Sequence, residues 1–169
     1  NINEDGTTVT ITPAEAAGMP EAWIAARKRD DQGNLVLGMD YPTIVPFLEL
    51  ATTADARRRV WMAKNREGGE QNLKLLEQAL KLRYELAQLH GQPDYATYTL
   101  KRRMAQTPAA VYTFLDQVKA AAVPLQAKEL AELRAEKARI DGTAVADTKL
   151  NRWDVNYLKE RVRKARYSI

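Results

Sequence analysis

The sequence has no cysteine, and its 169 residues include a single histidine, His90. The absence of cysteine excludes disulfides, thiolate metal sites and a cysteine nucleophile, and one histidine excludes a metal site with several imidazole ligands within this chain. No apolar run approaches the roughly 20 residues of a membrane span, and no basic stretch leads into an apolar one as in a secretory signal. Thiol chemistry, multi-histidine metal chemistry and membrane insertion are therefore not expected functions.

The composition is that of a folded chain. Hydrophobic residues make up 45% and charged residues 28% of the sequence, and values of this size disfavour disorder and a collagen-like fold. A chain of 169 residues is long enough to bury about two-thirds of the surface that it exposes when unfolded. We therefore expect a folded soluble chain with one ordinary hydrophobic core.

The positive charge is concentrated near the C-terminal end. The formal net charge is +4, and the stretch from Arg152 to Arg166 carries that whole excess, because it holds six basic residues and two acidic ones. A basic helix can contact nucleic-acid phosphates. Here lysine and arginine are spread around the helix circumference, which favours a solvated helix face.

Two strands are expected in the N-terminal part. Residues 7–11 alternate polar and apolar β-branched side chains, the period of a half-buried strand, and residues 35–39 form a second apolar run. A lone strand leaves its backbone groups unsatisfied, so we expect the two strands to pair. Between them, Thr12 and Glu15 have the spacing of a capping box, and residues 21–29 predict a short helix.

From residue 43 onward the sequence has the periodicity of amphipathic helices. The helix expected over residues 70–89 carries two stripes of large hydrophobic side chains, so it should have neighbours on more than one side and lie centrally in a bundle. The longest helix should begin at residue 108 and run to about residue 139, with Pro124 as an expected kink. Further helices are expected over residues 43–51, 53–67 and 95–104, and from residue 151 onward.

These patterns predict a mainly α fold: a helical bundle with long helices plus a small two-stranded β element near the N-terminus. We expect residues 1–169 to form one helical domain, with residues 1–42 as a small strand-containing entry and residues 43–169 as the helical bundle. The chain starts with Asn1, and its last residues follow a helical pattern without a capping glycine. We therefore expect a fragment of a larger protein; a trimmed but complete domain is the alternative.

No set of residues has the spacing of a recognised catalytic centre. His90 has neither a second histidine nor a glutamate at metal-ligand spacing, and its place beside Gly91 is typical of a helix end. The sequence has no glycine-rich phosphate loop, no Gly-x-Ser-x-Gly elbow and no His-Glu-x-x-His motif. We therefore assign no catalytic, no metal-binding and no cofactor-binding residue in this chain.

Trp153 and Asp154, at the start of the last expected helix, are given structural roles. Asn151 can cap this helix, and Asp154 three residues later can accept hydrogen bonds from amides at the helix start. Trp153 is expected to pack at the junction between loop and bundle, and Trp23 and Trp61 in the core or an interface. Truncation to alanine should cost about 3 to 5 kcal/mol at Trp153 if its ring is fully buried, and about 0.5 to 2 kcal/mol at Asp154.

Several segments, taken in order, resemble the zinc metallopeptidases that include thimet oligopeptidase, oligopeptidase A and bacterial peptidyl-dipeptidase. The resemblance spans nearly the whole chain, and in that family such segments lie in the helical region that precedes the catalytic motif. A Leu-rich helix ending in glycine is common, but Gly-x-x-x-Tyr-Ala followed by Met-Ala and then Trp-Asp is a specific combination. The matching segments are residues 16–21 (AAGMPE), 39–42 (MDYP), 82–89 (LRYELAQL), 91–96 (GQPDYA), 101–105 (KRRMA) and 153–157 (WDVNY).

The resemblance implies a mostly helical enzyme with two lobes that flank a deep channel, cutting short peptides. It also implies one zinc held by His-Glu-x-x-His and a later glutamate, with the glutamate of the motif activating the zinc-bound water. None of these residues maps onto this sequence, which lacks the motif. The chain is then expected to be a non-catalytic fragment upstream of the motif, with zinc in the parent protein and none in this chain.

The same resemblance sets the expected partners. These are short peptide substrates for the parent protein and the missing catalytic lobe for this chain, with no nucleic acid and no membrane. Without that lobe the chain should expose an apolar patch larger than the few hundred Å² usual for a monomer, through which it can self-associate. The expected compartment is the cytoplasm, and the lack of cysteine is also compatible with the periplasm.

Two other functions remain open at this point. The long helices and the lack of a catalytic set also fit a free-standing helical protein-interaction module. The basic final helix also fits a nucleic-acid binder, whose affinity would fall steeply with salt.

Overall fold

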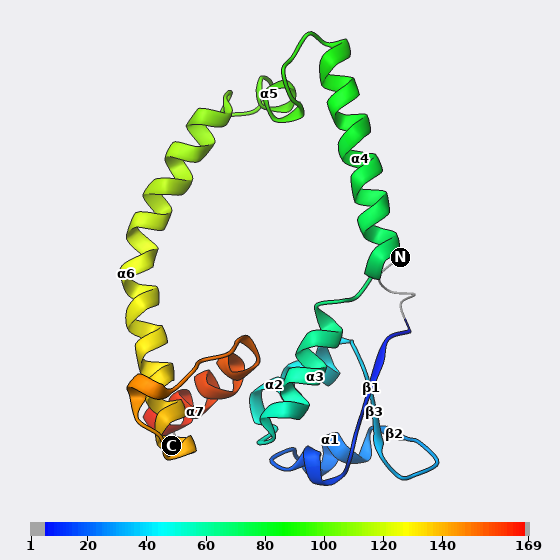
Figure 1. Ribbon diagram of the computed structural model, residues 1–169, viewed down its shortest axis with the longest axis vertical. Helices are drawn as coiled ribbons and strands as arrows, with labels where there is room; N and C mark the ends of the chain where they lie inside the picture. The colour runs from blue at the N-terminus through cyan, green and yellow to red at the C-terminus, as the bar shows by residue number, and fades with distance from the viewer. Residues whose placement is uncertain (1–5, 168–169) are drawn as a thin grey trace. The chain divides into compact units, whose positions relative to one another are not determined.

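A computed structural model describes residues 6–167, and Figure 1 shows the order of the elements along the chain. The chain divides into two compact units: one holds the chain up to Glu67 and from Leu130 onward, and the other is Gly68–Glu129. The prediction of a mainly α chain with long helices and a small sheet near the N-terminus is confirmed. The strands are β1 (Thr8–Ile11), β2 (Lys28–Arg29) and β3 (Leu35–Gly38), and the helices are α1 (Glu21–Ala25), α2 (Tyr41–Leu50), α3 (Ala54–Lys64), α4 (Gly69–Leu89), α5 (Tyr95–Leu100), α6 (Pro108–Asp141) and α7 (Val155–Tyr167), with 3-10 turns η2 (Ala14–Ala16), η3 (Val145–Asp147) and η4 (Arg152–Asp154).

The sheet has three antiparallel strands in the order β1-β3-β2. The sequence predicts that the strands near residues 7–11 and 35–39 pair, and this is confirmed: β1 pairs with β3, with Thr8 opposite Gly38 and Ile11 opposite Leu35. Strand β2 corrects the prediction of a two-stranded element. The helix expected over residues 21–29 ends at Ala25, and Lys28–Arg29 pairs with β3 instead.

The turn that follows β2 explains this difference. The carboxylate of Asp30 accepts hydrogen bonds from the backbone of Gln32 and Asn34 and from the Asn34 side chain. These bonds, that of the Asn34 side chain foremost, lower the pKa of Asp30 below its ordinary value. The turn reverses the chain, so that β3 runs back along Lys28–Arg29 as the second strand of a hairpin. This hairpin geometry overrides the helix propensity of lysine and arginine.

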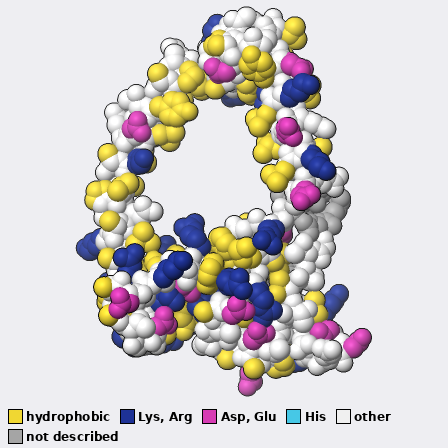
Figure 2. Space-filling view, in the orientation of Figure 1, with side chains coloured by type: hydrophobic (Ala, Val, Ile, Leu, Met, Phe, Trp, Pro, Cys, Tyr) yellow, Lys and Arg dark blue, Asp and Glu magenta, His cyan; other side chains and the backbone are white. Residues whose placement is uncertain are grey.

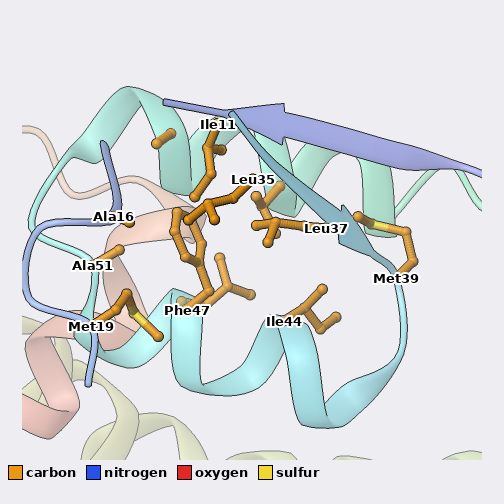
Figure 3. Packing of buried hydrophobic residues seen from close by; sticks show 12 residues of the cluster. Ile11, Ala16, Met19, Leu35, Leu37, Met39, Ile44, Phe47 and Ala51 are labelled. Carbon is orange, nitrogen blue, oxygen red and sulfur yellow. The ribbon is translucent and has the colours of Figure 1, made fainter. Parts of the chain in front are cut away.

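The main hydrophobic core lies in the first unit, between the sheet and helices α2 and α3. Figure 3 shows Ile44 and Phe47 of α2 directed toward Leu35 and Leu37 of β3. Phe47 is fully buried, and its ring stacks on that of Trp23 with 5.8 Å between centroids. The N-terminus of α2 is capped by Asp40, whose side chain accepts a hydrogen bond of 2.9 Å from the Thr43 amide.

A second, smaller core joins the last part of α6 to α7. Leu133 of α6 packs with Tyr157 and Leu158 of α7, and all three are buried. Helix α7 also contacts α2, and η4 contacts α3. The first unit is therefore built from two stretches of chain that are far apart in the sequence.

The second unit consists of α4, α5 and the first part of α6. Helix α4 ends at Leu89, two residues before Gly91. The φ of Gly91 is 62°, the left-handed conformation expected of a glycine just after a helix end. Asp94 caps α5 by accepting a hydrogen bond of 2.7 Å from the Thr97 amide, and this bond lowers the pKa of Asp94. Thr107 caps α6 in the predicted position before Pro108. Helix α6 continues through Pro124 to Asp141.

The two phenylalanines of the chain provide a test of where the core lies. Phe47→Ala should lower the free energy of unfolding by about 3 to 5 kcal/mol, because it leaves a cavity under the sheet. Phe114→Ala, on a side chain that is 62% exposed, should change the stability of the isolated chain by less than about 0.5 kcal/mol. Urea denaturation measures both, and equal shifts of the two midpoints would contradict this placement of the core.

Candidate functional site

The only histidine lies where the sequence places it, at the end of α4. His90 is the residue that follows Leu89, and its ring stacks on Tyr98 of α5 with 4.7 Å between centroids. Within residues 6–167 no group of three or more histidine, aspartate or glutamate side chains is placed to hold a metal ion. The residues present therefore do not fit a zinc site of the His-Glu-x-x-His type. That this chain contains no catalytic, metal or cofactor residue stays a prediction.

The most unusual chemical feature is a group of three charged side chains, two of them buried, which we call the Arg57 cluster: the buried Arg57 of α3 and Asp154 of η4, and the partly buried Lys137 of α6. Arg57 and Asp154 are 3% and 1% exposed. An Nη atom of Arg57 lies 3.1 Å from Oδ1 of Asp154, and Nζ of Lys137 lies 3.3 Å from Oδ2. Both carboxylate oxygens of Asp154 therefore face a cation.

The guanidinium of Arg57 also binds backbone from both stretches of the first unit. It donates to the carbonyl oxygens of Ala51 at 2.7 Å and Thr52 at 3.0 Å, and to that of Trp153 at 3.3 Å. Its flat face lies over the ring of Tyr157, 4.2 Å from the centroid. A buried charge is tolerated when its hydrogen-bonding capacity is used in this way.

Asp154 combines this ion pair with the helix cap that the sequence predicts. Its carboxylate accepts hydrogen bonds from the amide and the side chain of Asn151, at 3.2 and 3.1 Å. The capping role is confirmed. The roles of Arg57 and Lys137 were missed, because Arg57 and Asp154 are 97 residues apart in the sequence. One signal in the sequence could have indicated a buried charge: Arg57 follows Ala56 directly, and Ala56 is on the buried side of α3 together with Val60.

Trp153 of η4 is partly buried, so the condition of full burial that was attached to its stability prediction is not met. Its ring lies against that of Trp61, with 6.2 Å between centroids. The two rings line a pocket of about 290 Å³ together with Leu48, Arg152, Val155, Asn156 and Lys159. Because the condition of full burial is not met, truncation of Trp153 should cost less than the 3 to 5 kcal/mol of a buried ring.

Three basic side chains of α7 form ion pairs with glutamates. Arg163 donates to both carboxylate oxygens of Glu160 at 2.7 Å, and Lys164 lies 3.4 Å from the same group. The hydrogen bonds from Arg163 lower the pKa of Glu160 below its ordinary value. Arg166 pairs with Glu132 of α6. These pairs favour a solvated helix face over a phosphate-binding one.

The second unit exposes many large hydrophobic side chains. Figure 2 shows hydrophobic side chains following α4 and α6. Eight large hydrophobic side chains of α4 are between 39% and 84% exposed, although α4 has the sequence of a helix with packed neighbours. Exposed apolar surface is typical of a protein interface where it forms a continuous patch. On α6 the exposed members are Tyr112, Phe114, Leu115, Val118, Val123 and Leu125.

Comparison with known proteins gives consistent matches along the chain. The sequence profile of Peptidase family M3 matches residues 47–169. Oligopeptidase A of Escherichia coli is 33% identical over 96% of this chain, which corresponds to 25% of that protein. Oligopeptidase A of Salmonella typhimurium is 34% identical over 97% of the chain and 25% of that protein. Saccharolysin of Saccharomyces cerevisiae is 34% identical over 82% of the chain and 20% of that protein. The chain thus spans a quarter or less of the length of these relatives.

The Arg57 cluster leads to a stability prediction. Asp154→Ala should lower the free energy of unfolding by about 3 to 5 kcal/mol, more than a lost helix cap, because it leaves Arg57 buried without its counter-ion. Asp55→Ala is the matched control, since the Asp55 side chain is 60% exposed and pairs with Arg58 at the surface; its cost should not exceed about 1 kcal/mol. Denaturant melts of both variants decide this, and similar midpoints for the two would show that the buried pair is not a major constraint.

Proposed function

Because this chain belongs to peptidase family M3, we propose that it is a non-catalytic fragment of a zinc-dependent oligopeptidase or peptidyl-dipeptidase that cuts short peptides. The observation that carries this proposal is the combination of two facts. The family match and the identity to oligopeptidase A extend over most of the chain, and yet the chain has one histidine and no His-Glu-x-x-His motif.

The chemistry is then supplied by parts of the parent protein outside this chain. Zinc bound there would activate a water molecule for attack on the peptide carbonyl. The residues present here do not fit that metal site, so their contribution is to hold the scaffold of one part of a two-lobed enzyme and a part of its channel wall. The Arg57 cluster supports this role, because its ion pairs join two distant stretches of chain.

Partners and compartment follow from the same proposal. The parent protein acts on short peptides, and this chain binds the catalytic lobe of that protein rather than nucleic acid or a membrane. Among the described helices none combines the length and the hydrophobicity needed to cross a membrane. We propose the cytoplasm as the compartment, with the periplasm as the second choice.

Metal analysis and a peptidase assay test the proposal. The 169-residue chain should bind no stoichiometric zinc and cleave no short peptide, because it lacks the zinc ligands. The full-length parent protein should contain one zinc per chain and lose activity when a chelator removes it.

Two results would overturn the proposal. One is stoichiometric zinc, or peptide cleavage, in the purified chain. The other is a coding region with a start codon directly before Asn1 and a stop codon directly after Ile169, which would favour the free-standing interaction module.

A further inference from the structure

A pocket lined by two tryptophans lies where four elements of the first unit meet, and we call it the tryptophan pocket. Helix α2 contacts α7, and η4 contacts both α3 and α7. Leu48 of α2, Trp61 of α3, Trp153 of η4 and Lys159 of α7 are among the lining residues, and the volume is about 290 Å³. Small-molecule sites begin at about 300 Å³, so the pocket has room for one ring with a short substituent.

The apolar part of the lining is largely aromatic. Leu48 is 6% exposed, and Trp61 and Trp153 are partly buried, with 6.2 Å between their ring centroids. Indole rings offer flat surfaces against which another ring stacks or packs edge to face. The backbone of Trp153 is held in place, because the buried Arg57 donates a hydrogen bond of 3.3 Å to its carbonyl oxygen. The aromatic wall is therefore positioned by the fold, as is usual for a pre-formed ligand site.

The polar part of the lining has two positive charges and no negative one. Its side chains are those of Arg152, Asn156 and Lys159, all exposed, and no aspartate or glutamate lines the pocket. Within residues 6–167 neither Arg152 nor Lys159 has an ion pair or a side-chain hydrogen bond, whereas three later cations of α7 are paired with glutamates. Asp154 and Glu160, the acidic residues of this segment, are bonded to other cations.

These two parts of the lining together fit an aromatic anion. Arg152 and Lys159 attract an anionic group and repel a cationic one, and an arginine side chain binds a carboxylate or a phosphate through two parallel hydrogen bonds. Phosphate sites commonly contain glycine, so that backbone N–H groups can approach the phosphate. No glycine lines this pocket. The lining therefore favours a carboxylate over a phosphate.

We propose that the tryptophan pocket binds a small aromatic carboxylate, with the ring against Trp61 and Trp153 and the carboxylate at Arg152 and Lys159. A free aromatic acid and the C-terminal aromatic residue of a peptide share this chemistry. The inference goes beyond the proposed function and does not depend on it, because the pocket uses no zinc and consists of residues of this chain alone.

Calorimetric titration of the 169-residue chain with phenylpropionate tests the proposal. A ligand of this size should bind with a dissociation constant of about 1 mM or lower. Phenylpropionamide keeps the ring without the charge, and propionate keeps the charge without the ring; each should bind at least about tenfold more weakly. A tripeptide that ends in phenylalanine, with a free or an amidated C-terminus, then distinguishes a peptide terminus from a free acid as the source of the carboxylate.

Single substitutions at the surface locate the binding site. Arg152→Gln and Lys159→Gln should each weaken the binding of phenylpropionate at least about fivefold, because each removes a charged hydrogen-bond donor. Lys149→Gln is the matched control: it removes the same charge from an exposed side chain that does not line the pocket, and it should change the affinity less than about twofold. Circular dichroism and the melting temperature confirm that each variant is folded.

Four results would overturn the inference. The first three are no heat of binding at millimolar phenylpropionate, equal binding of phenylpropionamide, and an affinity that neither Arg152→Gln nor Lys159→Gln changes. The fourth is binding by the 169-residue chain but not by the full-length parent protein, which would make the pocket an interface covered by another part of that protein. Zinc content and peptide cleavage, which test the proposed function, are independent of all four.

Discussion

The first unit depends on the rule that a buried charge must be paired. Arg57 and Asp154 have almost no contact with water, so neither can be left without a partner unless the unit opens. Their pairing requires η4 to lie against α3, although 97 residues separate the two side chains in the sequence. It also requires the end of α6 to lie close by, because Lys137 neutralises the second carboxylate oxygen of Asp154. Once these three positions are fixed, α7 follows directly from η4 and packs on α2.

This arrangement fixes the orientation of the two stretches of chain relative to each other. Hydrogen bonds from Arg57 reach backbone carbonyls on both sides of the junction, so a shift of either stretch of chain would break several directional contacts together. A purely apolar contact would allow the two stretches to slide with little penalty, because hydrophobic attraction is not directional. The charged cluster thus contributes orientation more than net stability.

The local features of the fold could be predicted from the sequence, and the long-range ones could not. Alternating β-branched residues located β1, and the capping box of Thr12 and Glu15 formed as expected, because each depends on neighbours a few residues away. Strand β2 was missed, since two residues carry no periodicity and only the Asp30 turn defines them. The partners of Asp154 were missed because no spacing rule links residues so far apart. The resemblance to the family depends on the amino-acid sequences and the order of several segments, and on no catalytic or metal-binding residue.

Helix α4 carries more large hydrophobic side chains than its described contacts cover. The free energy gained by burying a large apolar side chain is about 1.5 to 3 kcal/mol, so a water-facing helix has no stability reason to carry leucines on two opposite sides. Helix propensity does not require them either, because lysine and glutamate serve a solvated helix nearly as well as leucine. The double stripe of α4 therefore indicates neighbours on two sides, whereas the neighbour that the described residues show is α5, which contacts the C-terminal end of the helix.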